Sequence, residues 1–108
     1  MNALASGQAP DRQRADLWLF RARLFKSRST AARFIEAGGV RIERAGQVRR
    51  LERASAGVMT GDVLVFVRGA DPVQVRVLSL GERRGPAAEA RALYERLDRI
   101  ETPPPEEG

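Results

Sequence analysis

Basic side chains that could bind phosphate gather in the first half of the chain. Residues 12–53 hold 12 basic residues against four acidic ones, whereas residues 54–108 hold seven against nine. All but one of the basic residues are arginine, whose planar guanidinium can hold two phosphate oxygens at once. A GC-rich genome would explain much of the excess of arginine over lysine, but not this asymmetry. These residues are suited to binding a polyanion, and nucleic acid is the first candidate.

Catalysis is not expected from this composition. The chain has no cysteine and no histidine, so thiolate nucleophiles, zinc sites with these ligands and the commonest general base are all missing. Ser27 has no histidine and no nearby lysine pair that could activate it as a nucleophile. We therefore expect a binding protein with no enzymatic activity, no cofactor and no metal site.

The polar residues that could act together surround two short predicted helices and the turn that follows them. They are Arg14, Asp16, Arg21, Arg23, Lys26, Ser27, Arg28, Arg33, Arg41 and Arg44. The free N–H groups at the start of the second helix, near Ser27, would favour a phosphate, and Arg33 on its exposed side could meet the next one. The alternative is an ordinary solvated helix face.

Two helices are predicted at residues 14–25 and 30–37. The first is apolar on two opposite sides, with Trp18 in one stripe, so it should lie centrally with neighbours on both sides. Ser27 or Ser29 can cap the second helix, and Gly38 with the glycine after it can end that helix.

In the remaining chain, apolar and polar residues first alternate as in strands and then follow the spacing of a helix. Strands are predicted at 40–42, 47–51, 63–68 and 73–80, with turns at 43–46 and 69–72. Residues 86–99 read as a third helix that starts with Pro86 and buries Ala90, Leu93, Tyr94 and Leu97. The expected fold class is α+β.

The domain division follows from composition. Residues 1–13 are predicted to be a disordered tail, 14–80 the binding domain, 81–100 a helical extension and 101–108 an acidic disordered tail. No segment has the apolar run of a signal peptide or membrane span, so we expect a cytoplasmic protein that does not contact membranes.

The order of these residues resembles the RNA-binding domain of small-subunit ribosomal protein S4. The resemblance rests on Arg14-Ala15-Asp16-Leu17-Trp18-Leu19, Arg23, Lys26-Ser27-Arg28, Ala31, Ile35, Gly38, Val40 and the later Gly61-Asp62-Val63. Two positions depart from that pattern. Ala15 stands where leucine is usual, and Glu43 to Gly46 replaces an Asn-Gly turn with what looks like a longer one.

The end of the chain is similar to the extension of the bacterial heat shock protein 15 family. Residues 82–90 and Leu93-Tyr94-Glu95 carry this likeness. The family is a small stand-alone version of the domain, associated with large ribosomal subunits released with a blocked nascent chain and tRNA. The resemblance therefore implies a monomer that binds ribosomal RNA or the large subunit, with peptidyl-tRNA as a further expected partner, in recycling or rescue under heat stress. A long basic C-terminal tail, which many relatives carry, is not expected here.

The resemblance also implies which residues face RNA. They are Arg14, Arg23, Lys26, Ser27, Arg28, Arg33 and Arg41, with Arg44 expected to replace the contact of the missing turn asparagine. Asp16 and Gly38 would support the site, Asp16 by capping the first helix or by pairing with an arginine such as Arg28. Trp18 is expected in the core and Tyr94 between the third helix and the sheet. Arg83 and Arg84 could form a second contact patch or a solvated loop.

The main alternative is a DNA-binding protein of the helix-turn-helix kind. Two helices joined by a short turn allow it. The second helix argues against DNA binding, because its exposed side presents mainly Thr30, Arg33 and Glu36, which offer few contacts to base edges.

Overall fold

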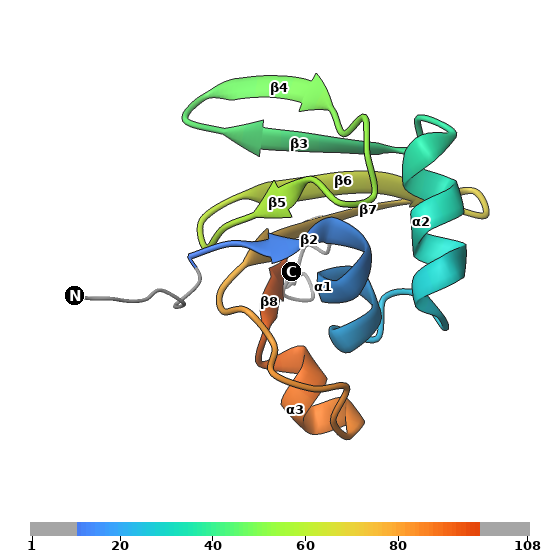
Figure 1. Ribbon diagram of the computed structural model, residues 1–108. Helices are drawn as coiled ribbons and strands as arrows, with labels where there is room; N and C mark the ends of the chain where they lie inside the picture. The colour runs from blue at the N-terminus through green and yellow to red at the C-terminus, as the bar shows by residue number, and fades with distance from the viewer. Residues whose placement is uncertain (1–10, 98–108) are drawn as a thin grey trace, which may run out of the picture.

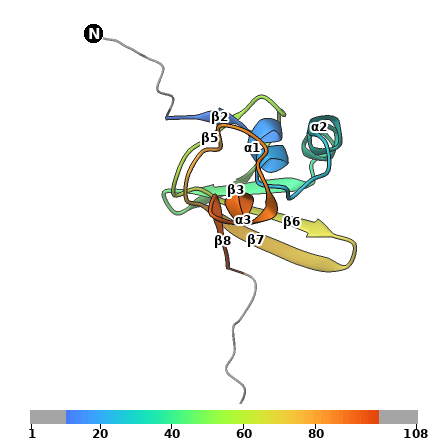
Figure 2. The same cartoon turned by 90° about the horizontal axis from the view of Figure 1, so that it is seen from below.

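The computed structural model describes residues 11–97, in which two helices pack on one face of an antiparallel sheet (Figures 1 and 2). The sheet has five strands in the order β4-β3-β6-β7-β8, and β2 pairs separately with β5. The strands are β2 (Gln13–Arg14), β3 (Val40–Arg44), β4 (Gln47–Arg50), β5 (Gly57–Val58), β6 (Val63–Arg68), β7 (Asp71–Val77) and β8 (Tyr94–Arg96). The α+β prediction is confirmed. Residues 1–10 and the expected acidic tail at 101–108 lie outside the described residues, whereas Gln13 belongs to a strand.

Helix α1 (Ala15–Arg21) lies centrally, as its two apolar sides predict. Trp18 and Leu19 are fully buried, and the indole Nε1 of Trp18 donates a hydrogen bond of 2.9 Å to the carbonyl oxygen of Ser79. The predicted end at residue 25 is wrong. The helix stops at Arg21 because the chain turns there and Arg23 takes a left-handed conformation, with φ of 61°, which a right-handed helix cannot contain.

Helix α2 (Arg28–Glu36) begins and ends as its flanking residues dictate. The Ser27 Oγ accepts a hydrogen bond of 3.0 Å from the Thr30 N–H, which confirms Ser27 as the N-cap. After the helix, Gly38 has φ of 88° and its N–H donates to the Ile35 carbonyl, while the next N–H donates to the Phe34 carbonyl. This is a Schellman C-cap, and it turns the chain into β3.

The turn between β3 and β4 is shorter than the sequence suggested. Glu43 and Arg44 still pair with β4, so the turn contains only Ala45 and Gly46. Their φ angles of 54° and 80° are those of a type I′ turn, whose twist matches that of the two strands. The prediction of a longer turn at 43–46 is therefore wrong.

Alternation along the strands divides the sheet into two faces. Val73, Val75 and Val77 are buried, as expected, and on β3 Val40 and Ile42 join them beneath the helices. Arg41 lies between the last two in sequence and is exposed, so its side chain points to the opposite face of the sheet.

The expected C-terminal helix is formed only at its start, and its second half contains a strand instead. Helix α3 covers only Ala87–Arg91, with Pro86 as its N-cap and not its first residue, and the chain then returns as β8 alongside β7. A helix continuing to residue 97 would leave the edge of β7 unpaired, and strand pairing satisfies those N–H and carbonyl groups. Tyr94 accordingly lies in the strand, its ring edge-on to Trp18 at 6.4 Å between centroids. The end of the predicted helix, residues 98–99, lies outside the described residues.

Candidate nucleic-acid interface

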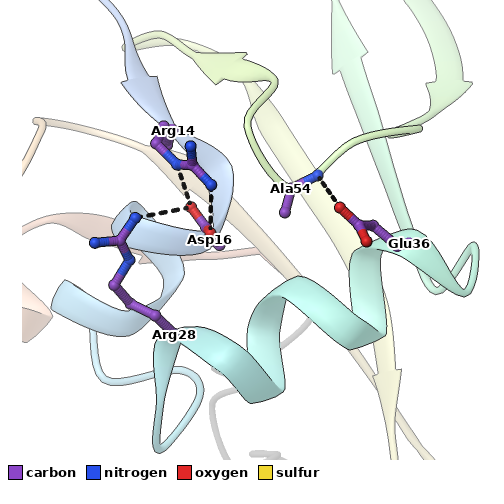
Figure 3. Close-up of polar contacts among 5 residues, drawn as sticks. All are labelled: Arg14, Asp16, Arg28, Glu36 and Ala54. Carbon is purple, nitrogen blue, oxygen red and sulfur yellow. Dashed lines mark hydrogen bonds and ion pairs between the residues drawn. The ribbon is translucent and has the colours of Figure 1, made fainter.

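A buried carboxylate joins the first two helices at their exposed side. Asp16 is only 4% exposed and accepts two hydrogen bonds of 3.0 Å from the Nε and Nη2 atoms of Arg14. The Arg28 Nη2 atom lies 3.8 Å from Asp16 Oδ1, the oxygen that also accepts from the Arg14 Nε (Figure 3). Both arginine side chains remain about half exposed, at 49% and 46%. Asp16 thus pairs with arginine, as expected, and Arg14 is the closer partner.

The charge of Asp16 is set by its surroundings. Burial acts to raise the pKa of this carboxyl, but the hydrogen bonds and charge of Arg14 act against it, helped by the Leu17 N–H and Arg28. The net result is a pKa below the ordinary value for aspartate. At neutral pH the group is therefore a carboxylate that fixes the direction of the Arg14 guanidinium and attracts that of Arg28.

A loop that ends near β5 holds the two helices in place. The Ala15 and Asp16 N–H groups at the start of α1 donate to the carbonyl oxygens of Ala56 and Ala54, at 2.8 and 3.2 Å. The Ala54 N–H donates in turn to the Glu36 carboxylate at the end of α2, at 3.3 Å (Figure 3). The start of α1 is therefore occupied by backbone, which leaves the start of α2 as the position for an anion.

The first turn of α2 keeps donors for a ligand. The Thr30 N–H is taken by Ser27, whose hydroxyl also bonds to the Thr30 side chain at 2.8 Å. The N–H groups of Arg28 and Ser29 precede the first hydrogen bond within the helix and have no partner among the described residues. Ser27 itself is engaged as the cap, so its own contribution is to shape this turn.

Lys26 in the turn before α2 and Arg33 within α2 are two further candidate cations. Both are exposed, and neither forms an ion pair with a carboxylate within residues 11–97. Arg28 and Arg33 are five residues apart, which is about 7.5 Å along the helix axis and about 140° around it. We call the four exposed cations Arg14, Lys26, Arg28 and Arg33 the helical arginine face; Asp16 joins Arg14 to Arg28, and Lys26 and Arg33 lie before and after Arg28 in the chain.

Two other expected contacts lie apart from this face. Arg41 is on the opposite face of the sheet, beside Arg50 of the neighbouring strand. Arg23 sits in the turn between the helices, where its Nε donates to the Gly85 carbonyl at 2.7 Å. The geometry therefore separates Arg41 from the helices and ties Arg23 to the C-terminal extension.

Arg44 is engaged inside the molecule. Its Nε and Nη2 atoms donate to the two carboxylate oxygens of Asp62 at 2.8 and 2.7 Å, and Nη2 also donates to the Gly57 carbonyl at 3.0 Å. Asp62 is 2% exposed and takes a further bond from the Met59 N–H. The hydrogen bond to Asp62 raises the pKa of Arg44. We therefore assign Arg44 to the scaffold and leave it out of the interface, contrary to the expectation from the sequence.

Three cations around the end of β4 were not singled out from the sequence. Arg49, Arg50 and Arg53 line a hollow of about 330 Å³ after β4. Arg50 lies against Gly38, where an added Cβ would be 3.2 Å from its Nη1 atom. The doublet of arginines was the available signal, and only the pairing of β3 with β4 brings Arg50 to the C-terminal end of α2.

Other kinds of site find no support in residues 11–97. That part of the chain has no group of three or more histidine, cysteine, aspartate or glutamate side chains placed to hold a metal ion. Nor does it have a helix of the length and apolarity needed to cross a bilayer.

Comparison with known proteins places these features in a family. The sequence model of the S4 domain family matches residues 13–43, which span α1, α2 and most of β3. The heat shock protein 15 homolog of Haemophilus influenzae is 31% identical over 85 residues, 79% of this chain and 61% of that protein. Heat shock protein 15 of Escherichia coli is 38% identical over 82 residues, 76% and 58% of the two chains. This chain thus spans about three fifths of the length of these curated relatives.

A solved structure agrees with the sequence comparison. The trimeric structure of Vibrio cholerae heat shock protein 15 matches with a TM-score of 0.69 and 30% identity, covering 79% of this chain and 81% of that one. The likeness in fold and sequence covers most of both chains. The chain therefore belongs to the heat shock protein 15 family, which has an S4-type domain.

Proposed function

We propose that this protein binds structured RNA through the helical arginine face and carries out no reaction on it. The observation that carries the proposal is the Asp16 carboxylate, which holds two half-exposed guanidinium groups next to the free N–H groups at the start of α2. Guanidinium groups and helix N-termini are both phosphate ligands. Their fixed positions favour an RNA whose fold sets the spacing of its phosphates.

Recognition by this face would read shape more than sequence. The exposed side of α2 presents Arg28, Arg33 and Glu36, whereas base-specific helices usually carry several side chains able to reach base edges. Folded RNA is recognised mainly through its phosphates, its 2′-hydroxyl groups and its shape. We therefore favour RNA over duplex DNA.

The membership in the heat shock protein 15 family supports a narrower proposal. The RNA would be ribosomal RNA of the large subunit, and the occasion would be recycling or rescue of subunits that carry a blocked nascent chain and peptidyl-tRNA under heat stress. We place this activity in the cytoplasm. We also propose that the protein acts as a monomer, although a family member forms a trimer in its solved structure; analytical ultracentrifugation of the free protein and of its RNA complex tests this point.

The decisive experiment reverses the charge of two residues of the face. Arg28→Glu with Arg33→Glu should abolish co-sedimentation with ribosomes while the thermal unfolding midpoint stays nearly unchanged. The matched control is Arg76→Glu with Arg91→Glu, which changes the net charge equally at exposed positions on β7 and α3. The control should keep most of the binding. A folded Arg28→Glu/Arg33→Glu protein that still co-sediments, or two variants that lose binding equally, would contradict the proposed face.

Salt and competitor experiments test the chemistry. If the complex contains about six phosphate contacts, its affinity should fall by roughly a thousandfold between low and physiological salt. Unlabelled folded ribosomal RNA should compete for binding far better than duplex DNA of the same length. Affinity that hardly changes with salt would argue against phosphate recognition, and effective competition by duplex DNA would favour the helix-turn-helix alternative.

A further inference from the structure

A hollow of about 460 Å³ lies at the turn between α1 and α2, beside the end of β6. Four cationic side chains line it, namely Arg23, Lys26, Arg68 and Arg84. None of the four forms an ion pair with a carboxylate within residues 11–97, although five such pairs occur elsewhere in that part of the chain. Four like charges around one hollow repel each other, and a bound anion would remove that repulsion.

The wall of the hollow is apolar and partly aromatic. Leu24 is buried, and the ring of Phe25 packs against Phe34 and Phe66 at 5.3 Å between centroids in each case. The Arg68 guanidinium lies 5.5 Å from the centroid of Phe25 and 5.9 Å from that of Phe66. A planar cation held on two rings offers a flat surface on which a planar ligand can stack.

Two of the cations are held in position by the backbone. Arg23 donates through Nε to the Gly85 carbonyl at 2.7 Å, and Arg84 donates through Nε to the Phe20 carbonyl at 3.0 Å. The Arg84 guanidinium also lies 4.6 Å from the centroid of the Phe20 ring. A binding group fixed in this way loses less conformational entropy when a ligand arrives. Arg23 keeps the left-handed conformation noted above, which is uncommon for a residue with a side chain and frequent at ligand sites.

We propose that this hollow holds one unpaired nucleotide of the RNA. The base would lie against Leu24 and Phe25 and stack with Arg68, while its phosphate would be bound by Lys26 and Arg23. A ligand that is planar and apolar at one end and anionic at the other fits this combination of walls. The volume is within the range of roughly 300–1,000 Å³ that is common for pockets with small organic ligands. The inference rests on the proposed function, because it assumes that the RNA bound by the neighbouring α2 supplies the nucleotide.

Three RNA hairpins with the same stem test the proposal. One is fully paired, one has a single bulged adenosine, and one has an abasic site at the bulge. Wild-type protein should bind the adenosine bulge about tenfold more tightly than either of the others, since stacking of one base commonly gives such a gain. Lys26→Ala with Arg68→Ala should reduce that ratio to about one.

The matched control removes two cations from the helical arginine face. Arg28→Ala with Arg33→Ala should weaken binding of all three hairpins by a similar factor and preserve the preference for the adenosine bulge. Equal affinity of wild-type protein for the adenosine and abasic bulges would overturn the proposal. So would a preference that survives Lys26→Ala/Arg68→Ala in a folded protein.

A titration with adenosine monophosphate separates the pocket from the proposed function. Its binding can be followed by NMR through the amides of Leu24, Phe25 and Lys26. If no hairpin binds, the proposed function has failed, and amide shifts that Lys26→Ala/Arg68→Ala removes would still support a nucleotide pocket. No shifts together with no bulge preference would overturn the pocket. Adenosine monophosphate that binds as tightly as the bulged hairpin would identify a free nucleotide as the ligand and overturn its assignment to RNA.

Discussion

Two aspartates of this protein hold arginines in opposite ways. Asp62 and Arg44 form a closed pair, because the carboxylate receives two bonds from the guanidinium and a third from Met59, and the arginine also binds a backbone carbonyl. Asp16 also has one bidentate arginine and a backbone N–H, that of Leu17, but it forms an open arrangement because a second arginine lies at 3.8 Å, a distance too long for a hydrogen bond. The Arg44 side chain is 33% exposed, whereas those of Arg14 and Arg28 are nearly half exposed.

The difference separates arginines that build the fold from arginines that are free to bind. A guanidinium whose donors are already satisfied gains little by turning to a phosphate. It would also leave a buried carboxylate without its charge partner, which costs a large free energy. Arg28, which no hydrogen bond holds to Asp16, keeps its donors for a ligand, whereas Arg14 has the same bidentate geometry as Arg44 and differs from it in being more exposed. The type of residue is the same in both places, so partner geometry and not composition assigns the role.

Breaking the closed pair should have the largest effect on stability. Arg44→Ala would leave the Asp62 carboxylate buried without its charge partner, and we expect the free energy of unfolding to fall by about 3–5 kcal/mol. Urea unfolding followed by circular dichroism measures this change. Arg41→Ala on the same strand is the control, since an exposed arginine without an ion pair in the described chain should matter by less than about 0.5 kcal/mol. A loss of RNA affinity by folded Arg44→Ala protein would contradict our assignment of this residue to the scaffold.

Disrupting the open arrangement at Asp16 should lower the free energy of unfolding by less than disrupting the closed pair, and the effect should depend on pH. Asp16→Asn removes the charge that orients Arg14, and at neutral pH it should lower the free energy of unfolding by about 1–3 kcal/mol. The folded-state pKa of Asp16 is depressed, so its stabilisation is complete above the unfolded pKa of roughly 4 and is lost as the pH falls through the folded value. The free energies of unfolding of wild-type and Asp16→Asn protein, measured from about pH 7 down to about pH 2, should therefore converge at the acid end. A difference that stays constant down to the lowest pH would show that the carboxylate charge is not what stabilises α1.

Local signals in the sequence were sufficient for α2 and the central strands. Ser27 and Gly38 mark the ends of α2, and the alternating valines of β7 predict its buried face, because these features depend on residues close in sequence. The C-terminal segment could not be read in this way. Leu93 and Tyr94 fit the apolar stripe of a helix, and only the unpaired edge of β7, some twenty residues earlier in the chain, decides that Tyr94 enters a strand.

The candidate site was predictable in location but not in membership. The charge count pointed to the segment that contains α1 and α2, and the pairing of Asp16 with arginine was anticipated. Which arginines are free depends on contacts between distant residues, such as Arg44 with Asp62 and Arg68 with Phe25. Such contacts follow from the pairing of strands and have no signature in the local sequence.

The turn next to the closed pair offers a stabilising change. Ala45 has a left-handed conformation that asparagine tolerates better, and Asn-Gly is the preferred pair in a type I′ turn. Ala45→Asn should raise the free energy of unfolding by about 0.5–1 kcal/mol, which a urea titration can resolve. If the scaffold and the interface are independent, RNA affinity should not change and the gain should add to that of a distant substitution. Stronger RNA binding by Ala45→Asn would instead place this turn in the interface.

The smallest effect on stability is expected at the arginine that the open arrangement holds most loosely. Arg28→Ala should change the free energy of unfolding by less than about 0.5 kcal/mol, because a half-exposed ion pair at 3.8 Å contributes little. Its effect on RNA should be distinct: affinity falls severalfold for all folded RNAs alike, and the slope of log affinity against log salt decreases by about one, as expected for a lost phosphate contact. Fluorescence anisotropy at several salt concentrations measures both quantities. An unchanged salt slope would mean that Arg28 serves Asp16 alone, and the contrast between the two aspartates would then be one of strength and not of function.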